Sequence, residues 1–550
     1  MVQNRFREAL EQGTFVVSVE AVPGRGACEP SQVKTLDEAQ EIWETGLVQA
    51  VSITDAPGGA PALPAATFAK SFAERGVVPL VHLTCKDKNR NQIESELYSL
   101  QRAGIENVLC MTGDAPAGGW MGQARPVFDL DPVTMTQLIC DMNAGMAYPR
   151  GKKMVRTAPA NFFPGAVVSP FKWTEGEVFT QLYKVKKKVE AGAKFIISQV
   201  GYDARKMQEM LFLMRDEGID VPVIANTFVL NAGIGASMNR GAFPGCDVTD
   251  ELLAELRKEK ELPDGGLQAR LDRAAKFIAV ARGMGYAGVH LGGVNVDAQN
   301  IKYMLERAEE YERDWQTVAR DIMFAQKDCF WAYKQDPETL LNTHERNPLE
   351  ADLFGQRAIR GNYRMSRLFH KMVFIPGSPI NSIFKKVIGG KDKKRGHNRK
   401  HGIEHISKVA LYHCIDCGDC GLYACGYTCP MSQCPKCQRN GPCGGSHDGW
   451  CEVFPGERYC IWYKAYHRTK HYGNQESLAN YIVPPNNWAN WQTSPWGNMV
   501  GGRDGYARRG WMPGVAPDKE FLEGPQAAED APKRYSLEGE EPKDASTPKE

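Results

Sequence analysis

The sequence predicts an α/β fold in which a closed (β/α)8 barrel of the TIM type is followed by a cysteine-rich metal-binding domain and an extended C-terminal arm. Across about the first 310 residues, short apolar runs alternate with longer charged segments of helical spacing. Eight such runs occur, which is the number of strands in this barrel. Ten of the 16 cysteines then crowd between residues 414 and 460.

The eight apolar runs are the predicted strands. They span residues 15–22, 50–54, 78–84, 107–112, 165–169, 195–200, 221–225 and 288–291. In six cases a glycine just ahead of the strand ends the preceding helix, because glycine adopts the left-handed conformation at little cost. These glycines are Gly46, Gly76, Gly104, Gly192, Gly218 and Gly285. A Rossmann fold is the alternative, but Gly233-Ile234-Gly235 lacks the third fingerprint glycine and is not expected to open a helix after a strand.

Polar residues stand where the predicted strands end, which is the position of active sites in such barrels. They are Glu20, Thr54, Asp55, His82, Thr84, Thr112, Asp114, Gln199 and Asn226. Any one of them alone is explained by a cap or a hydrogen-bonded core position. Their joint occurrence at one rim predicts a functional site.

The cysteine region predicts metal binding. The first half reads Cys414-x2-Cys417-x2-Cys420-x4-Cys425-x3-Cys429-Pro430, and the second half contains Cys434, Cys437, Cys443, Cys451 and Cys460. The first half has the rhythm of a ferredoxin-type iron-sulfur ligand run, interrupted by Cys425. The second half fits either a tetrahedral zinc site or a second cluster. Ten thiolates suffice for two metal centres, and a purely structural zinc domain is the alternative.

Charge and hydropathy exclude several classes of protein. The 67 Lys and Arg balance 66 Asp and Glu, so no overall field favours nucleic acid, and the basic run at 391–400 is interpreted as a solvated linker. The N-terminus lacks the apolar run of a signal peptide, and no stretch approaches the roughly 20 apolar residues of a membrane span. We therefore expect a cytoplasmic protein with no membrane span.

Five segments are expected along the chain. The barrel covers residues 1–312. A helical connector with a basic linker covers 313–400, and the cysteine-rich module covers 401–470. A Trp-, Asn- and Pro-rich arm covers 471–525, and a disordered acidic tail 526–550.

Ordered motifs in the barrel resemble the methylenetetrahydrofolate reductase family. They are Val19-Glu20-Ala21-Val22-Pro23, Ser52-Ile53-Thr54, His82-Leu83-Thr84-Cys85, Thr112-Gly113-Asp114-Ala115-Pro116 and the segment from Lys188 to Gln199. The cysteine region, including Asn440-Gly441-Pro442-Cys443-Gly444-Gly445, resembles the cysteine-rich partner module of anaerobic members of that family. In those members the module is commonly a separate subunit, whereas here it is fused to the barrel.

The resemblance implies reduction of 5,10-methylenetetrahydrofolate to 5-methyltetrahydrofolate by a flavin. It assigns Glu20 as the acid, with a pKa raised by burial, and Asp114 as the carboxylate facing flavin and pterin. The implied substrate contacts are Gln199, Asn226 and Phe228. The implied flavin contacts are Thr54, His82, Thr84, Asp114, Ser169 and Lys188. The flavin is expected to be FAD; FMN is the alternative, because Gln181 replaces an acidic flavin contact.

The resemblance also implies an electron supply. The cysteine module would carry an iron-sulfur cluster of the 4Fe-4S type, with zinc as the alternative for the second centre. Electrons would come from ferredoxin or electron-transfer subunits in an oligomer or complex, or from NADH. Two other functions remain open: a folate-binding methyltransferase barrel without flavin, and a metal-stabilised scaffold subunit of a redox complex.

Overall fold

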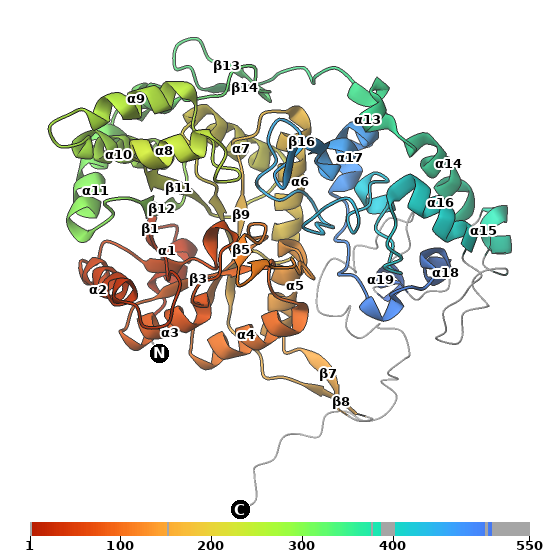
Figure 1. The fold of residues 1–550 in the computed structure, drawn as a ribbon. Helices are drawn as coiled ribbons and strands as arrows, with labels where there is room; N and C mark the ends of the chain where they lie inside the picture. Colours follow the sequence, from red (N-terminus) through yellow and green to blue (C-terminus); the bar gives the residue numbers. More distant parts are fainter. Residues whose placement is uncertain are drawn as a thin grey trace, which may run out of the picture.

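The computed structural model describes residues 3–150, 153–375, 378–384, 386, 402–500 and 504–508. The predicted acidic tail and the basic run at 391–400 lie outside these residues. In Figure 1 the barrel runs from red through green, and the C-terminal part, in blue, lies against one side of it.

Eight parallel strands close the barrel in the order β1-β12-β11-β10-β9-β4-β3-β2. They are β1 (Val16–Ala21), β2 (Ala50–Ile53), β3 (Pro79–Thr84), β4 (Asn107–Met111), β9 (Phe163–Val168), β10 (Phe195–Ser198), β11 (Val223–Val229) and β12 (Gly288–Gly293). Each overlaps a predicted run, so all eight strand predictions are confirmed, although β11 extends four residues beyond its predicted end. The ring closes where β1 pairs with β12, with Ser18 opposite His290. A closed ring excludes the open Rossmann sheet.

Helices fill the connections between strands. They are α1 (Arg5–Glu11), α2 (Pro30–Glu44), α3 (Ala65–Glu74), α4 (Arg90–Arg102), α5 (Pro132–Asn143), α6 (Glu175–Glu190), α7 (Ala204–Asp216), α8 (Ala232–Asn239), α9 (Asp250–Lys260), α10 (Leu267–Met284) and α11 (Ala298–Glu312). The six predicted glycines all have positive φ, from 67° at Gly218 to 109° at Gly192. One expectation is wrong: Gly233 and Gly235 do lie in a helix, α8, that follows strand β11.

Two small hairpins interrupt the barrel's loops, β5 (Gly118–Gly119) with β6 (Gly122–Gln123) and β7 (Ala147–Arg150) with β8 (Lys153–Arg156). The connector is not wholly helical. After α12 (Trp315–Ala319) it forms a hairpin of β13 (Tyr333–Gln335) and β14 (Asn342–Arg346) before α13 (Arg357–Arg360), α14 (Tyr363–Val373) and α15 (Pro379–Phe384). The side chain of Arg205 on α7 holds this hairpin, through Oδ1 of Asn342 and the carbonyl of Tyr333, both at 3.0 Å.

The cysteine-rich region has little regular structure between α16 (Gly402–Tyr412) and α17 (Ile461–Lys470), apart from the short pair β15 (Trp450–Cys451) and β16 (Phe454–Tyr459). Beyond it lie α18 (Pro495–Val500) and α19 (Gly505–Arg508). Helix α17 packs on α6: the rings of Phe179 and Tyr466 stack at 5.8 Å, and the Tyr466 hydroxyl donates to buried Glu175 at 2.6 Å. In the part of the chain that the structure describes, no helix is both long and apolar enough to cross a membrane.

Candidate active site at the mouth of the barrel

Five strands place functional side chains two residues apart, so that both members of each pair lie on the same face of their strand. The pairs are Ser18 and Glu20 on β1, Ser52 and Thr54 at β2, His82 and Thr84 on β3, Asn226 and Phe228 on β11, and His290 and Gly292 on β12. Cross-strand hydrogen bonds show that this face is the barrel interior: Ser18 meets His290 at 2.9 Å and Ser52 meets His82 at 2.6 Å. The predicted polar rim therefore surrounds one site.

Glu20 lies at the centre of this site. Its Oε2 is 3.9 Å from Nε2 of His290, and its side chain is 26% exposed, so it is open toward the mouth. A Cβ added at Gly292 would lie 3.4 Å from the Phe228 ring and 3.6 Å from Oε1 of Glu20. Glycine at 292 therefore keeps a gap between the predicted acid and the predicted substrate contact.

The pKa of Glu20 is set by burial and by two histidines. Burial raises the pKa, but the proximity of His290, together with the charge of His82, lowers it by more, and the net pKa lies below the ordinary carboxyl value. Burial and the proximity of His290 lower the pKa of His82 to about 4. The two histidines that outweigh burial come from strands distant in sequence from β1. The expectation concerned a carboxyl covered by flavin and pterin rings, and it stays a prediction.

Thr84 is committed to an internal network rather than left open for a ligand. Its backbone N–H and hydroxyl donate to Oδ2 of Asp55 at 2.9 and 2.8 Å, and Lys88 reaches the same oxygen at 2.9 Å. Burial raises the pKa of Asp55, and Lys88 and Thr84 together lower it by more. Asp55 therefore acts as a fixed anion that ties β3 to the end of β2.

Asp114 follows β4 in a tight turn. Its Oδ2 accepts a hydrogen bond from the N–H of Gly58 at 2.8 Å. Gly113 has a φ of 82°, and a Cβ there would lie 2.9 Å from Cβ of Thr84, so this position requires glycine for both conformation and space. The turn delivers the Asp114 carboxylate, partly exposed, to the rim that Glu20 occupies.

Two buried hydroxyl oxygens at the mouth have no hydrogen-bond partner in the described part of the chain: Oγ1 of Thr54 after β2 and Oγ of Ser169 after β9. A buried hydroxyl without a partner costs free energy, so an unmatched pair at one mouth fits a bound ligand with polar edges. Both residues are predicted flavin contacts, and the ring edge of a flavin supplies such groups. The residues present therefore fit a flavin.

Lys188, Gln199 and Asn226 have local partners. Nζ of Lys188 donates to the carbonyl of Val167, between α6 and β9, where burial and the charge of Lys184 hold its pKa well below the usual range. Oε1 of Gln199 accepts from the N–H of Val200 at 2.8 Å. Asn226 stands opposite His290 in the β11–β12 register. Of the three, Asn226 thus lies on the strand next to His290 and near Glu20, whereas Lys188 lies within the barrel wall.

The cysteine-rich module reaches the mouth, which the sequence did not predict. Buried lysines of the barrel donate to its backbone: Lys172 to the carbonyls of Gly444 at 2.5 Å and Ser446 at 2.6 Å, and Lys184 to that of Pro442 at 2.8 Å. Gln181 likewise donates to the carbonyl of Cys443 at 2.8 Å. An amide at position 181 can donate to this backbone carbonyl, whereas a carboxylate there could not.

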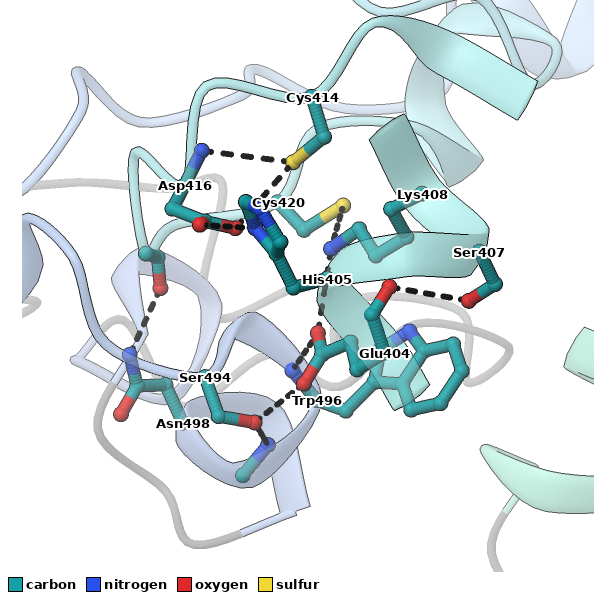
Figure 2. Close-up of polar contacts among 12 residues, drawn as sticks. Glu404, His405, Ser407, Lys408, Cys414, Asp416, Cys420, Ser494, Trp496 and Asn498 are labelled. Atoms are coloured by element: carbon teal, nitrogen blue, oxygen red, sulfur yellow. Dashed lines mark hydrogen bonds and ion pairs between the residues drawn. The ribbon is translucent and has the colours of Figure 1, made fainter. Parts of the chain in front are cut away.

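The first five cysteines share one neighbourhood. The charges of Cys420 and Cys429 each raise the pKa of Cys414, Cys417 and Cys425, in addition to the larger effect of burial. Figure 2 shows the buried amine of Lys408 between Glu404, at 3.2 Å, and the sulfur of Cys420, at 3.8 Å. Burial raises the pKa of Cys420, and the charge of Lys408 partly offsets that effect, in the direction of the thiolate that binds metal.

The second neighbourhood contains Cys434, Cys443, Cys451 and Cys460. Burial raises the pKa of Cys443 most, and the charges of Glu452, Cys460 and Cys434 raise it further. Burial also raises the pKa of Cys460, to about 11, and the charge of Cys451 adds to this effect. The sulfur of Cys443 is 3.1 Å from Oε2 of Glu452. All ten thiols are free, and soft thiolates suit zinc and iron-sulfur clusters. Among the described residues, no three His, Cys, Asp or Glu side chains form a site for a single ion, so metal binding stays a prediction.

A closed (β/α)8 barrel with a carboxylate, two histidines and two hydroxyls without partners at the carboxyl ends of its strands has the architecture of barrel enzymes, whose sites lie at the mouth. The chain belongs to the methylenetetrahydrofolate reductase family, whose model matches residues 5–308. A second family model, described as the C terminal of methylene-tetrahydrofolate reductase, matches residues 394–489.

Known relatives are distant. Methylenetetrahydrofolate reductase 2 of Saccharomyces cerevisiae is 26% identical over 34% of this chain and 30% of its own length. The probable NADH-type enzyme of Oryza sativa is 24% identical over 55% of this chain and 50% of its own. The chain thus spans at most half of either relative. A solved Clostridium thermocellum protein, described as binding two copies of 5-methyl-5,6,7,8-tetrahydrofolic acid, aligns at 12% identity over 56% of this chain and 98% of that one, with a TM-score of 0.39.

Proposed function

We propose that the barrel interconverts 5,10-methylenetetrahydrofolate and 5-methyltetrahydrofolate. The observation that carries this proposal is the meeting of Glu20, His290 and Phe228 around Gly292, at the same mouth as the unmatched hydroxyls of Thr54 and Ser169. Thr54, Ser169 and Asp114 would hold the flavin, which supplies the hydride when bound. FAD is preferred to FMN because of the family resemblance.

We assign to Glu20 the proton transfer that the reaction needs; because its pKa lies below the ordinary carboxyl value, the protonated form is the minor one at neutral pH. The bridging methylene of the folate becomes reactive only when one C–N bond opens, and opening requires a proton on the leaving nitrogen. Glu20 is partly exposed toward the mouth, where it can pass a proton to a bound substrate, and Nε2 of His290 lies 3.9 Å from its carboxylate. Asp114 stabilises the positive charge that then develops on the folate.

Replacement of Glu20 tests this role. Glu20→Gln should lower folate reduction by about 10²- to 10⁴-fold, the usual contribution of a general acid, and should leave flavin content unchanged. Exposed Glu309 on α11 provides the matched control, since Glu309→Gln should change neither quantity. A full rate in Glu20→Gln would refute the assignment. Protein purified without oxygen that binds folate but shows no flavin absorbance would favour the methyltransferase alternative.

We further propose that the cysteine-rich module binds metal and passes electrons to the barrel from a ferredoxin-like partner. The grouping of nine of its ten thiols in two neighbourhoods supports this, as does its contact with the barrel through Lys172, Lys184 and Gln181. Iron and acid-labile sulfide in stoichiometric amounts would support the relay. Zinc alone would refute the relay, leaving NADH as the donor and a structural role for the module.

A further inference from the structure

One side chain of the cysteine-rich module is built into the barrel's rim. Lys436 is 2% exposed, and its Nζ donates to the carbonyl of Gly113 at 2.8 Å, across 323 residues of sequence. The same amine forms an ion pair with Glu452, whose side chain is 5% exposed. A buried cation with these two partners has a fixed position, because moving it would leave buried charge unpaired.

A second contact fixes the turn that contains Gly113 and Asp114. Oε1 of Gln438 accepts from the hydroxyl of Thr112 at 3.1 Å and from Nζ of Lys184 at 2.8 Å. Thr112 and Gly113, the two residues ahead of Asp114, are thus each bonded to the module. On its other side Asp114 is bonded to the N–H of Gly58. The turn that presents Asp114 is therefore clamped between the β2 loop and the module.

We propose that Lys436 is a positioning residue of the barrel's site: it holds the Gly113–Asp114 turn, and its charge favours the reduced, anionic form of a flavin bound there. This inference rests on the proposed function, since it requires a flavin at the mouth. The physical reason is that charges interact strongly where water is excluded, and that nearby charge tunes the electronics of a flavin. Glu452 opposes the effect, because it carries the counter-charge.

The test uses the full chain purified without oxygen and follows the midpoint potential of the flavin in a reductive titration. Lys436→Met should disfavour the reduced flavin by about tenfold relative to the oxidised form, a shift of about 30 mV to lower potential for two electrons. Lys436→Arg should restore the wild-type potential, and Glu452→Gln should shift it to higher potential. Exposed Lys302 on α11 supplies the control Lys302→Met, which should leave the potential unchanged.

An unchanged potential in Lys436→Met, with wild-type flavin and metal content, would overturn the inference and leave the proposed function standing. Wild-type protein without flavin would overturn both. If Lys436→Met does not fold, Glu452→Gln decides: a higher potential at unchanged metal content supports the inference, and an unchanged or lower one overturns it. Metal content is measured because Glu452 also touches the sulfur of Cys443.

Discussion

His290 on β12 links the Glu20 carboxylate to the barrel wall: its Nε2 lies 3.9 Å from Oε2 of Glu20, and its Nδ1 lies 2.9 Å from the hydroxyl of Ser18. Ser18 and His290 are register partners where β1 and β12 close the ring. Closure of the barrel therefore assembles the three groups. Glu20 owes both its orientation and its lowered pKa to a strand that begins 268 residues after it in the chain.

Removal of the His290 ring should move the pH dependence of the reaction. His290 lowers the pKa of Glu20 while burial raises it, so His290→Asn should leave burial dominant and raise the pKa. If protonated Glu20 is required, the rate falls as pH rises through that pKa, and the variant should stay active to higher pH. The pH profile of kcat/KM checks this, with exposed His344→Asn as the control. If the alkaline limb of the profile stays in place or moves to lower pH, the assigned effect of His290 on the Glu20 pKa is contradicted.

The buried ring of His467 on α17 should make the fold sensitive to acid. The side chain is 0% exposed, and burial lowers its pKa to about 4, despite the opposing charge of Glu175. Between about pH 6.5 and 4 the unfolded chain binds a proton that the folded one does not, so stability falls as pH falls. Between pH 7.5 and 5 the free energy of unfolding should therefore fall by about 2 kcal/mol less in His467→Leu than in wild type.

Urea unfolding at the two pH values measures this difference. Replacement of His344, which is exposed on β14, by Leu should leave the pH dependence of the unfolding free energy as in wild type. Equal losses in wild type and His467→Leu would show that the ring gains its proton in the folded state.

The ion pair of Glu404 and Lys408 should be a structural requirement of the first cysteine neighbourhood. Both side chains are at most 5% exposed, and Glu404 also accepts from the hydroxyl of Ser494 and from the N–H of Trp496 at 3.0 Å. Lys408→Met leaves a buried carboxylate unpaired and should cost about 3–5 kcal/mol. Figure 2 shows that the same Glu404 carboxylate holds Ser494 and Trp496, so the segment 494–498 should loosen as well.

A double-mutant cycle separates charge from packing. Glu404→Gln combined with Lys408→Met should be less destabilised than the sum of the two single variants, because no charge remains unpaired. Lys34 and Glu38 form an exposed pair of the same spacing, with side chains 74% and 51% exposed, and Lys34→Met should change stability by less than about 0.5 kcal/mol. Equal effects of Lys408→Met and Lys34→Met would contradict the assignment.

Two glycines of similar conformation should respond differently to alanine. Gly418, between two predicted ligands, has a φ of 77°, and a Cβ there would lie 1.9 Å from the carbonyl oxygen of Asn490. Gly456 has a φ of 73°, with nothing within 4 Å of the added atom. Gly456→Ala should cost about 1 kcal/mol for backbone strain alone. Gly418→Ala should cost about 2–4 kcal/mol and should expose the arm near Asn490 to protease.

Thermal unfolding and limited proteolysis measure the two effects. Equal stability losses and equal cleavage rates in the two variants would show that the contact between Gly418 and Asn490 does not hold the arm.

The sequence alone determined the barrel, because the alternation that builds it is local. Each apolar run and each helix-ending glycine, such as Gly192 or Gly285, reports on its own neighbourhood within about ten residues. The rim could be predicted for the same reason: Glu20 and Asp114 stand at strand ends, and parallel strands of a barrel end at one mouth. The hairpin of β13 and β14 escaped prediction because contacts with α7 stabilise it.

Tertiary structure alone decided how the rim works. His290 gives no signal of its own in a buried apolar strand, yet it reverses the sign of the Glu20 pKa shift once the ring closes. Lys436 reads as one residue between two cysteines, and only the folded chain brings its charge to the turn of Asp114. The physical reason is range: secondary structure follows from residues that are neighbours in the chain, whereas electrostatic interactions depend on distance in space.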